Sequence, residues 1–247
     1  MLWPYITLAS AAAASYAGYA TMSPTSQLYG RTITHGSDSQ QIALTFDDGP
    51  NDPHTMHLLD VLARHNAKAT FFLIGRYVRQ RPEIARAILA AGHEIGNHTF
   101  SHPNLVLVSA RRLRQELDDC RKALEDALGT KTALFRPPFG GRRPSVLRTA
   151  RGMGLSPIMW SVTGYDWNAK SPDAIVDKVV RQVESRRRPR AEVVLLHDGG
   201  HLAFGADRRH TVEATRLLLE RYAGKEFVSI SNLRSATQAL HSPEGLR

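Results

Sequence analysis

The chain has 247 residues, of which 42% are hydrophobic and 22% charged, with one cysteine and a net charge of +9. This composition is that of a soluble globular protein with ample core, and it excludes a fibrous, disordered or internally disulfide-linked chain. The arginines are scattered along the chain without a recognition helix or zinc finger. We therefore expect no nucleic-acid partner, but a solvated basic surface with affinity for anionic envelope polymers.

The first 20 residues are mostly apolar, and the first charged side chain is Arg31. This length is near the roughly 20 residues that span a bilayer, and the small residues also suit a secretion signal. We expect residues 1–36 to form an apolar signal or anchor segment with a linker, and residues 37–247 to form one folded domain. The expected location is the cell envelope or the exterior; a cytosolic packed helix is the alternative.

Apolar runs alternate with helical patterns from Gln41 onward. The expected strands are 42–46, 69–74, 94–96, 133–136, 156–160, 193–196 and 227–230. The expected helices are 54–65, 82–91, 109–128, 145–151, 172–185 and 211–222. The third helix is the best marked, because Ser109 suits its N-cap, Gly129 follows its end, and Cys120 falls in register with its buried leucines.

Strand-helix alternation indicates parallel strands covered by helices, in a barrel or in a doubly wound sheet. The polar motifs follow at least five different strands, each at the C-terminal end. Loops from many strands converge at the top of a (β/α) barrel, whereas an open sheet concentrates its site at one switch point. We therefore expect an α/β fold, an irregular (β/α) barrel of seven or eight parallel strands.

The motif TFDDGP at 45–50 places two adjacent carboxylates, Asp47 and Asp48, after an apolar run. Asp, Gly and Pro are also standard turn formers, so a simple turn is the alternative. Two neighbouring carboxylates repel each other unless a cation lies between them. The pair therefore suits a cation site.

The motif HTFSH at 98–102 spaces His98 and His102 four residues apart. Nearby Gly96 and Pro103 indicate a loop or a single turn rather than a long helix. Metal binding is favoured over a solvated pair of histidines. Of the other histidines, only His201 lies near a motif, and we expect no ligand role for it.

The motif LLHD at 195–198 brings His197 to the end of a second apolar strand. A catalytic divalent ion needs three protein ligands and an open position, and hydrolysis needs a base and an acid. The ligands can come from Asp48, His98 and His102, which leaves Asp47 as base and His197 as acid.

Two further loops carry aromatic residues. The motif RPPFG at 136–140 is a rigid loop in which Arg136 can hold a carboxylate and Phe139 offers an aromatic wall. A solvated surface loop is the alternative. The segment 160–167 gathers Trp160, a Tyr and Trp167 around one acid, which is more typical of a sugar-binding wall than of core packing.

In order, TFDDGP, HTFSH, RPPFG, the segment 160–167 and LLHD resemble the five motifs of the polysaccharide deacetylases, carbohydrate esterase family 4. The family includes chitin, chitooligosaccharide, peptidoglycan and acetylxylan deacetylases. The resemblance covers about residues 41–240 and implies an irregular barrel and a polysaccharide deacetylase domain over 37–247. It also implies a metal-dependent hydrolase that removes N-acetyl groups from an N-acetylglucosamine glycan, and it implies no protein partner.

The resemblance also implies roles for individual residues. Asp47 would be the general base, paired with Arg136, and His197 would be the general acid, oriented by Asp166. Zinc is the usual metal of the family, held here by Asp48, His98 and His102. Substrate contacts would come from Phe139, Trp160, Trp167 and Leu195, the last lining a pocket for the acetyl methyl group.

The chain departs from the family pattern at two positions. Thr163 stands where many relatives have an acidic residue, and Phe139 replaces a frequent Tyr while keeping the ring and the backbone amide. Two rival functions stay open at this point: an O-acetyl esterase on xylan, and a non-catalytic glycan-binding module. The polymer and the metal are not readable from the residues, since Zn, Co, Ni and Fe all accept such ligands.

Overall fold

The computed structural model describes residues 15–234. Most of the apolar segment expected over 1–20 therefore lies outside the described residues. Residues 15–22 form a helix, and no helix within 15–234 combines the length and the apolar character that crossing a membrane requires.

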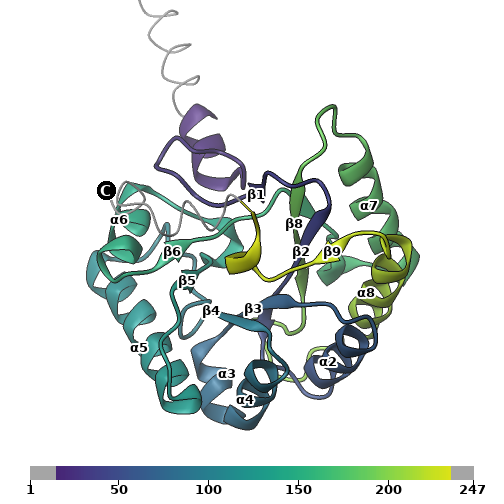
Figure 1. Ribbon diagram of the computed structural model, residues 1–247. Coiled ribbons are helices and arrows are strands. Elements are labelled where there is room, and N and C mark those ends of the chain that lie inside the picture. The colour runs from purple at the N-terminus through teal and green to yellow at the C-terminus, as the bar shows by residue number, and fades with distance from the viewer. Residues whose placement is uncertain (1–14, 235–247) are drawn as a thin grey trace, which may run out of the picture.

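Within residues 15–234 there are nine strands and, besides the helix at 15–22, seven labelled helices (Figure 1). The strands are His35–Gly36 (β1), Gln41–Gly49 (β2), Ala69–Leu73 (β3), Glu94–Asn97 (β4), Leu134–Phe135 (β5), Ser156–Pro157 (β6), Val162–Thr163 (β7), Ala191–His197 (β8) and Glu226–Phe227 (β9). The helices are His54–Arg64 (α2), Gly75–Gln80 (α3), Pro82–Ala90 (α4), Ala110–Leu128 (α5), Pro144–Gly152 (α6), Pro172–Glu184 (α7) and Arg209–Arg221 (α8). Short 3₁₀ turns lie at Pro138–Gly140 (η1), Asp166–Asn168 (η2) and Ile230–Asn232 (η3).

The strands form the expected irregular barrel. The order is β1-β8-β2-β3-β4-β5-β6, and β7 and β9 pair with β8 and β2; every pair except β1–β8 is parallel. Because β6 pairs with β5 and β7 pairs with β8, the single stretch 156–163 closes the sheet on itself. Ile33 forms a further parallel bridge to Ile158 beside this closure.

Side-chain alternation along β2 and β8 sorts the core into an inner and an outer layer. On β2, Ile42, Leu44 and Phe46 belong to the large cluster that packs under the helices, whereas Ala43 belongs to the smaller cluster inside the barrel. With a period of two, Asp47 follows Ala43 on the inner side. The same alternation on β8 aligns Leu195 and His197 with the inner Val193, so catalytic candidates at the strand ends face the barrel mouth.

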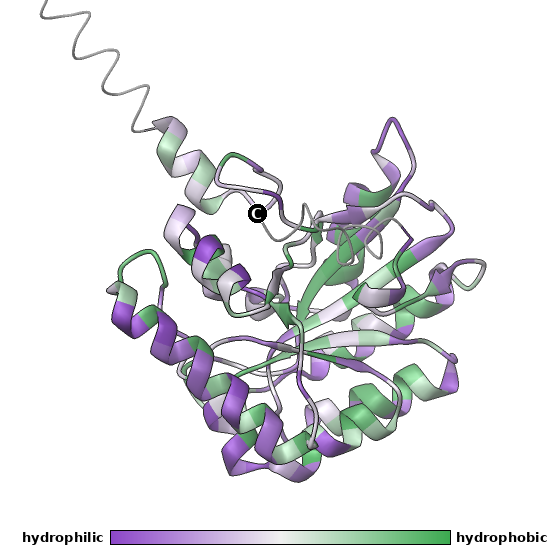
Figure 2. Cartoon of the chain, turned by 60° about the vertical axis from the view of Figure 1, so that its left-hand side comes forward, coloured by the Kyte–Doolittle hydropathy of each residue, from purple (hydrophilic) through white to green (hydrophobic). Residues whose placement is uncertain are grey.

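The helices form the outer layer, with polar residues along their solvent sides and apolar residues toward the strands (Figure 2). Helix α5 matches its expected bounds closely: the Ser109 side chain accepts from the N–H of Arg112, and Gly129 ends the helix with φ 67°. Cys120 is fully buried on its inner face, and burial raises the pKa of this thiol to about 12. Its reading as a small buried hydrophobe is confirmed.

The sequence misses α3, β1 and β7, and it overextends β5 and β6. These elements have two to six residues, too few to show a helical or strand period. Helix α3 also lacks a capping side chain, because the apolar Ile74 precedes it. The short strands form through long-range pairing in the barrel.

Candidate active site and metal centre

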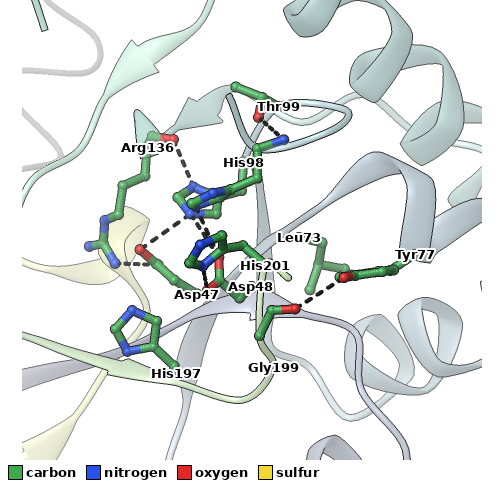
Figure 3. Close-up of polar contacts among 12 residues, drawn as sticks. Asp47, Asp48, Leu73, Tyr77, His98, Thr99, Arg136, His197, Gly199 and His201 are labelled. Atoms are coloured by element: carbon green, nitrogen blue, oxygen red, sulfur yellow. Dashed lines mark hydrogen bonds and ion pairs between the residues drawn. The ribbon is translucent and has the colours of Figure 1, made fainter. Parts of the chain in front are cut away.

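The motif residues converge on one cavity of about 550 Å³ at the C-terminal ends of the strands. Its walls include every expected metal ligand, the expected base and acid, and all four expected substrate contacts: Asp47, Asp48, His98, His102, His197, Phe139, Trp160, Trp167 and Leu195. Figure 3 shows several of these side chains turned toward one point. The two remaining candidates, Arg136 and Asp166, stand behind the wall and contact its residues.

Three buried side chains are arranged as metal ligands. Oδ1 of Asp48 lies 3.4 Å from Nε2 of His98 and 3.1 Å from Nε2 of His102. Two donors that share a tetrahedral zinc ion at about 2.1 Å lie about 3.4 Å apart, so these separations fit a divalent ion. The same three residues form the metal-compatible group found within residues 15–234.

The polar surroundings of this group also fit a cation. Nδ1 of His98 donates to the carbonyl oxygen of Arg136 at 2.8 Å, which leaves the Nε2 lone pair free to bind a metal. Burial raises the pKa of Asp48, but contacts with the imidazoles of His102, His201 and His98 outweigh it and hold that pKa well below its usual range. Asp48 is therefore ionised, the form that binding a metal requires.

The loop that carries both histidines is fixed by hydrogen bonds rather than by helical structure. Oδ1 of Asn97 accepts from the N–H of Thr99, whose Oγ1 accepts from the N–H of His102. Glu116 of α5 is buried, and its Oε2 accepts from the N–H groups of Phe100 and Ser101 at 3.0 and 2.8 Å. The expectation of a loop at 98–102 is confirmed.

Asp47 lies beside the ligands but faces a different partner. Its Oδ1 accepts from Nη1 of the fully buried Arg136 at 2.7 Å, and its Oδ2 lies 3.7 Å from Nε2 of His98. Arg136 is itself fixed, because it donates to Oγ1 of Thr45 and to the carbonyl oxygen of Met159. Asp47 thus keeps one oxygen for the arginine and turns the other to the cavity (Figure 3).

His197 ends β8, the strand next to β2, and is paired with a buried carboxylate. Nδ1 of His197 lies 2.8 Å from Oδ1 of Asp166, and Oδ2 accepts from the N–H of His197 and from Oγ1 of Thr211. Burial lowers the pKa of His197, but the Asp166 carboxylate outweighs it and raises that pKa to about 9. The imidazole is therefore cationic at neutral pH and has a proton to give.

Aromatic and apolar side chains form the rest of the wall. The Phe139 ring stands edge-on to His102 with centroids 4.7 Å apart, and the Trp167 ring stands edge-on to His197 at 5.2 Å. Both rings are about half exposed, whereas Leu195 is buried and Trp160 is partly buried against the barrel core. The wall is thus apolar near the cavity floor and aromatic at its rim.

Three neighbours of the site carried no usable signal in the sequence. Nδ1 of His201 lies 3.6 Å from Oδ2 of Asp48, and its ring stacks on His102, so it lies beside the candidate ligand group. Thr211 and Glu116 each belong to a helix far along the chain from the group that they hold. Thr211 is the third residue of α8 and Glu116 lies within α5, and neither position belongs to a motif.

The comparisons with known proteins agree with this geometry. The family model described as polysaccharide deacetylase matches residues 35–158. A chitooligosaccharide deacetylase of Sinorhizobium fredii is 40% identical over 69% of this chain and 78% of its own length. A peptidoglycan-N-acetylglucosamine deacetylase of Bacillus cereus is 37% identical over 78% of this chain and 87% of its own length.

Among solved structures, a CE4-family pseudoenzyme of Bacillus anthracis superimposes with a TM-score of 0.73 at 29% identity, covering 82% of this chain and 68% of that one. With motifs, barrel and relatives in agreement, the chain belongs to the polysaccharide deacetylase family. The resemblance and the fold expected from the sequence are both confirmed.

Proposed function

We propose that this protein is a metal-dependent hydrolase that removes N-acetyl groups from an N-acetylglucosamine glycan and releases acetate. The observation that carries the proposal is the convergence of a ligand group, Asp48, His98 and His102, with Asp47 and His197 on one cavity. The chitooligosaccharide and peptidoglycan substrates in the names of the relatives support the choice of glycan.

We assign zinc to the ligand group because two imidazoles and one carboxylate suit it. When bound, a divalent ion supplies Lewis acidity toward the amide carbonyl and makes water more acidic. Asp48 and the two histidines hold that ion. The hydrogen bond from Nδ1 of His98 to the carbonyl oxygen of Arg136 fixes the direction of the His98 donor, and Oγ1 of Thr99 holds the backbone N–H of His102.

Asp47 is the proposed general base. Its Oδ2 faces the cavity and is free to take a proton from the attacking water, while Arg136 holds Oδ1 at 2.7 Å. The buried guanidinium balances the carboxylate charge in a site that water leaves when substrate binds. Asp47 and Arg136 thus act as one positioned base.

His197 is the proposed general acid. With a pKa of about 9 it is protonated at neutral pH and can protonate the departing amine. Asp166 orients the ring through Nδ1, so Nε2 carries the transferred proton. The N–H of Phe139 is the proposed backbone donor to the oxyanion, and Leu195 gives the acetyl methyl group an apolar contact.

The rim aromatics, Phe139, Trp160 and Trp167, are the proposed platform for sugar rings, since an apolar face of a sugar stacks on an aromatic ring. Action at the cell envelope is supported by the peptidoglycan deacetylase among the relatives. Within this proposal, residues 1–36 serve as signal or anchor segment and linker, and residues 37–247 as catalytic domain.

A panel of substrates tests the proposal. Acetate release is measured with N-acetylglucosamine oligomers, peptidoglycan and acetylxylan, each with and without chelator. We expect release from the first two that chelation abolishes. Release from acetylxylan alone would indicate an O-acetyl esterase, and glycan binding without any release would indicate a non-catalytic module like the pseudoenzyme.

A further inference from the structure

Arg142 is a buried arginine to which none of the five motifs assigns a role. It joins the N-terminal segment at residues 21–26 to the active-site loop that carries Phe139 and Gly140. The residue is 1% exposed. Its Nη1 donates to the carbonyl oxygen of Gly140 at 3.0 Å, and its Nη2 donates to the carbonyl oxygens of Ser26, at 2.9 Å, and Ser23. Its backbone N–H donates to the carbonyl oxygen of Thr21 at 3.2 Å.

No carboxylate within residues 15–234 forms an ion pair with Arg142. Burial accordingly lowers the pKa of its guanidinium below the usual value. A buried cation without a counter-ion depends on its hydrogen-bond acceptors, and here these are main-chain carbonyls of two segments more than 100 residues apart. The two segments are therefore joined through Arg142, by its guanidinium and by its backbone N–H.

The active-site loop that is hydrogen-bonded to Arg142 has an unfavourable backbone conformation. Phe139 has φ 58° and Gly140 has φ 68°, so two consecutive residues are left-handed. For Phe this region is strained, and such residues persist where the surroundings over-determine them. At Gly140 a Cβ would lie 2.7 Å from the Trp160 ring, so the turn is also pressed against the cavity wall.

This turn places the Phe139 ring against His102, with centroids 4.7 Å apart. A change of a few tens of degrees at φ 58° would move both that ring and the N–H of the same residue. The carbonyl oxygen of Gly140, which accepts the hydrogen bond from Arg142, belongs to the residue that follows Phe139. The positions of residues 21–26 and of the Phe139 turn are thus linked through Arg142.

We propose that residues 21–26 and Arg142 form a clasp, defined by the contacts of Arg142 to Thr21, Ser23, Ser26 and Gly140, that positions the Phe139 turn in the active site. The proposal rests on the proposed deacetylase function for its kinetic consequences. Arg142 is a positioning residue that acts through Phe139. The segment ahead of the barrel is then part of the catalytic unit, and any processing of the chain that preserves activity leaves residues 21–26 attached.

The first test compares Arg142→Gln with Arg151→Gln in the full chain. Arg151 is the matched control, because its Nη2 donates to the carbonyl oxygen of Arg31 in the same N-terminal segment but it does not touch the active-site loop. We expect kcat on an N-acetylglucosamine oligomer to fall by about 10-fold to 100-fold in Arg142→Gln, as misplacement of a site element does. Zinc stoichiometry stays unchanged, and Arg151→Gln stays within twofold of the parent.

Amide hydrogen exchange gives a readout that is independent of activity. In Arg142→Gln, amides of 21–26 and of 137–142 should exchange faster together, while the rest of the barrel keeps its protection. Arg142→Lys keeps the charge but has all its donors on one nitrogen and cannot span both acceptor segments as the guanidinium does. It should therefore lie between the parent and Arg142→Gln in both measurements, and it also serves if Arg142→Gln does not fold.

A mutant cycle separates positioning from general stability. On a Phe139→Ala background, Arg142→Gln should lower kcat by a smaller factor than in the parent, because the ring that the clasp positions is already absent. Equal factors on both backgrounds, parent-like exchange over 137–142, or uniformly faster exchange throughout the barrel would each overturn the clasp. A parent chain that releases no acetate would refute the proposed function, while the exchange result would still decide the coupling.

Discussion

At the scale of single residues, the site depends on how two neighbouring aspartates come to face different partners. Alternation along β2 would point Asp48 away from the cavity that Asp47 faces. The pairing with β3 shifts register between Asp47 and Gly49, and Asp48 takes φ 70°. This bulge turns Asp48 back toward the histidines, and local strain of this kind is typical of functional sites.

The separation of the two carboxylates predicts different losses on substitution. Asp47→Asn should keep the metal and lower kcat by about 10²-fold to 10⁴-fold, because only the base is removed. Asp48→Asn should lose the metal, because it removes the charged ligand from a site whose other two ligands are neutral. Metal content by elemental analysis beside acetate release checks both. If Asp47→Asn emptied the site and Asp48→Asn did not, the assignments would be reversed.

The raised pKa of His197 predicts a pH dependence. The acid works when protonated, so kcat should fall as pH rises through about 9. Because the pKa of His197 is higher in the folded than in the unfolded chain, the His197–Asp166 pair also adds to the free energy of unfolding. This contribution is fully present below the unfolded pKa of about 6.5 and is lost as pH rises through about 9.

Asp166→Asn removes the charge that raises this pKa, so the alkaline limb should move to lower pH while metal content stays constant. The loss of kcat should be smaller than in His197→Ala, since the acid itself is retained. The kcat profile across pH, measured for the parent and for Asp166→Asn, decides. An alkaline limb at the same pH in both proteins would mean that Asp166 does not tune His197.

At the scale of elements, helix α5 supports the metal-binding loop although it contributes no ligand. Glu116 is 1% exposed, and its carboxylate accepts hydrogen bonds from two backbone N–H groups and from Oγ of Ser101. Arg112, one turn earlier on the helix, pairs with the same carboxylate at 2.5 Å. The position of His102 therefore depends on the docking of α5 against the loop.

Glu116→Ala should weaken metal binding by about 10-fold to 100-fold, the usual effect of losing a group that holds a ligand in place. Glu125→Ala is the matched control, because Glu125 lies on the same helix and pairs only with the partly exposed Arg121. Zinc affinity by competition with a chromophoric chelator checks this, with thermal unfolding alongside. Equal zinc affinities in the two variants would show that the loop holds its shape without α5.

Much of this element structure was predictable from local pattern. The run 42–46 and the leucine spacing of 109–128 each carry a clear period, and the observed β2 and α5 contain them. The short β1 and β7 carry none, because they exist only as partners of β8. The sequence motifs likewise indicated the residues that line the cavity. Glu116, Thr211 and the clasp residue Arg142 were missed, because their hydrogen-bond partners lie 15 to 119 residues away along the chain.

At the scale of the whole molecule, barrel closure makes one site from separate motifs. The proposed base and one proposed ligand lie at the end of β2, the histidine loop follows β4, the arginine loop follows β5, and the proposed acid ends β8. Parallel pairing brings these C-terminal ends to the same rim, and Asp47 lies directly opposite His197 in the β2–β8 register. Because each motif follows a strand at its C-terminal end, the convergence of the motifs was predictable from the sequence. The contribution of residues 21–36 to barrel closure and to the position of the Phe139 turn was not.

The central claim is that one metal ion per chain, held by Asp48, His98 and His102, enables hydrolysis with Asp47 as base. Metal-free protein is titrated with Zn²⁺ while acetate release from an N-acetylglucosamine oligomer and bound zinc are measured in the same samples. Activity should start near zero, rise in proportion to bound zinc and level off at one ion per chain, and Asp47→Asn should bind the same zinc without the activity. Full acetate release from protein shown to be metal-free would contradict the account.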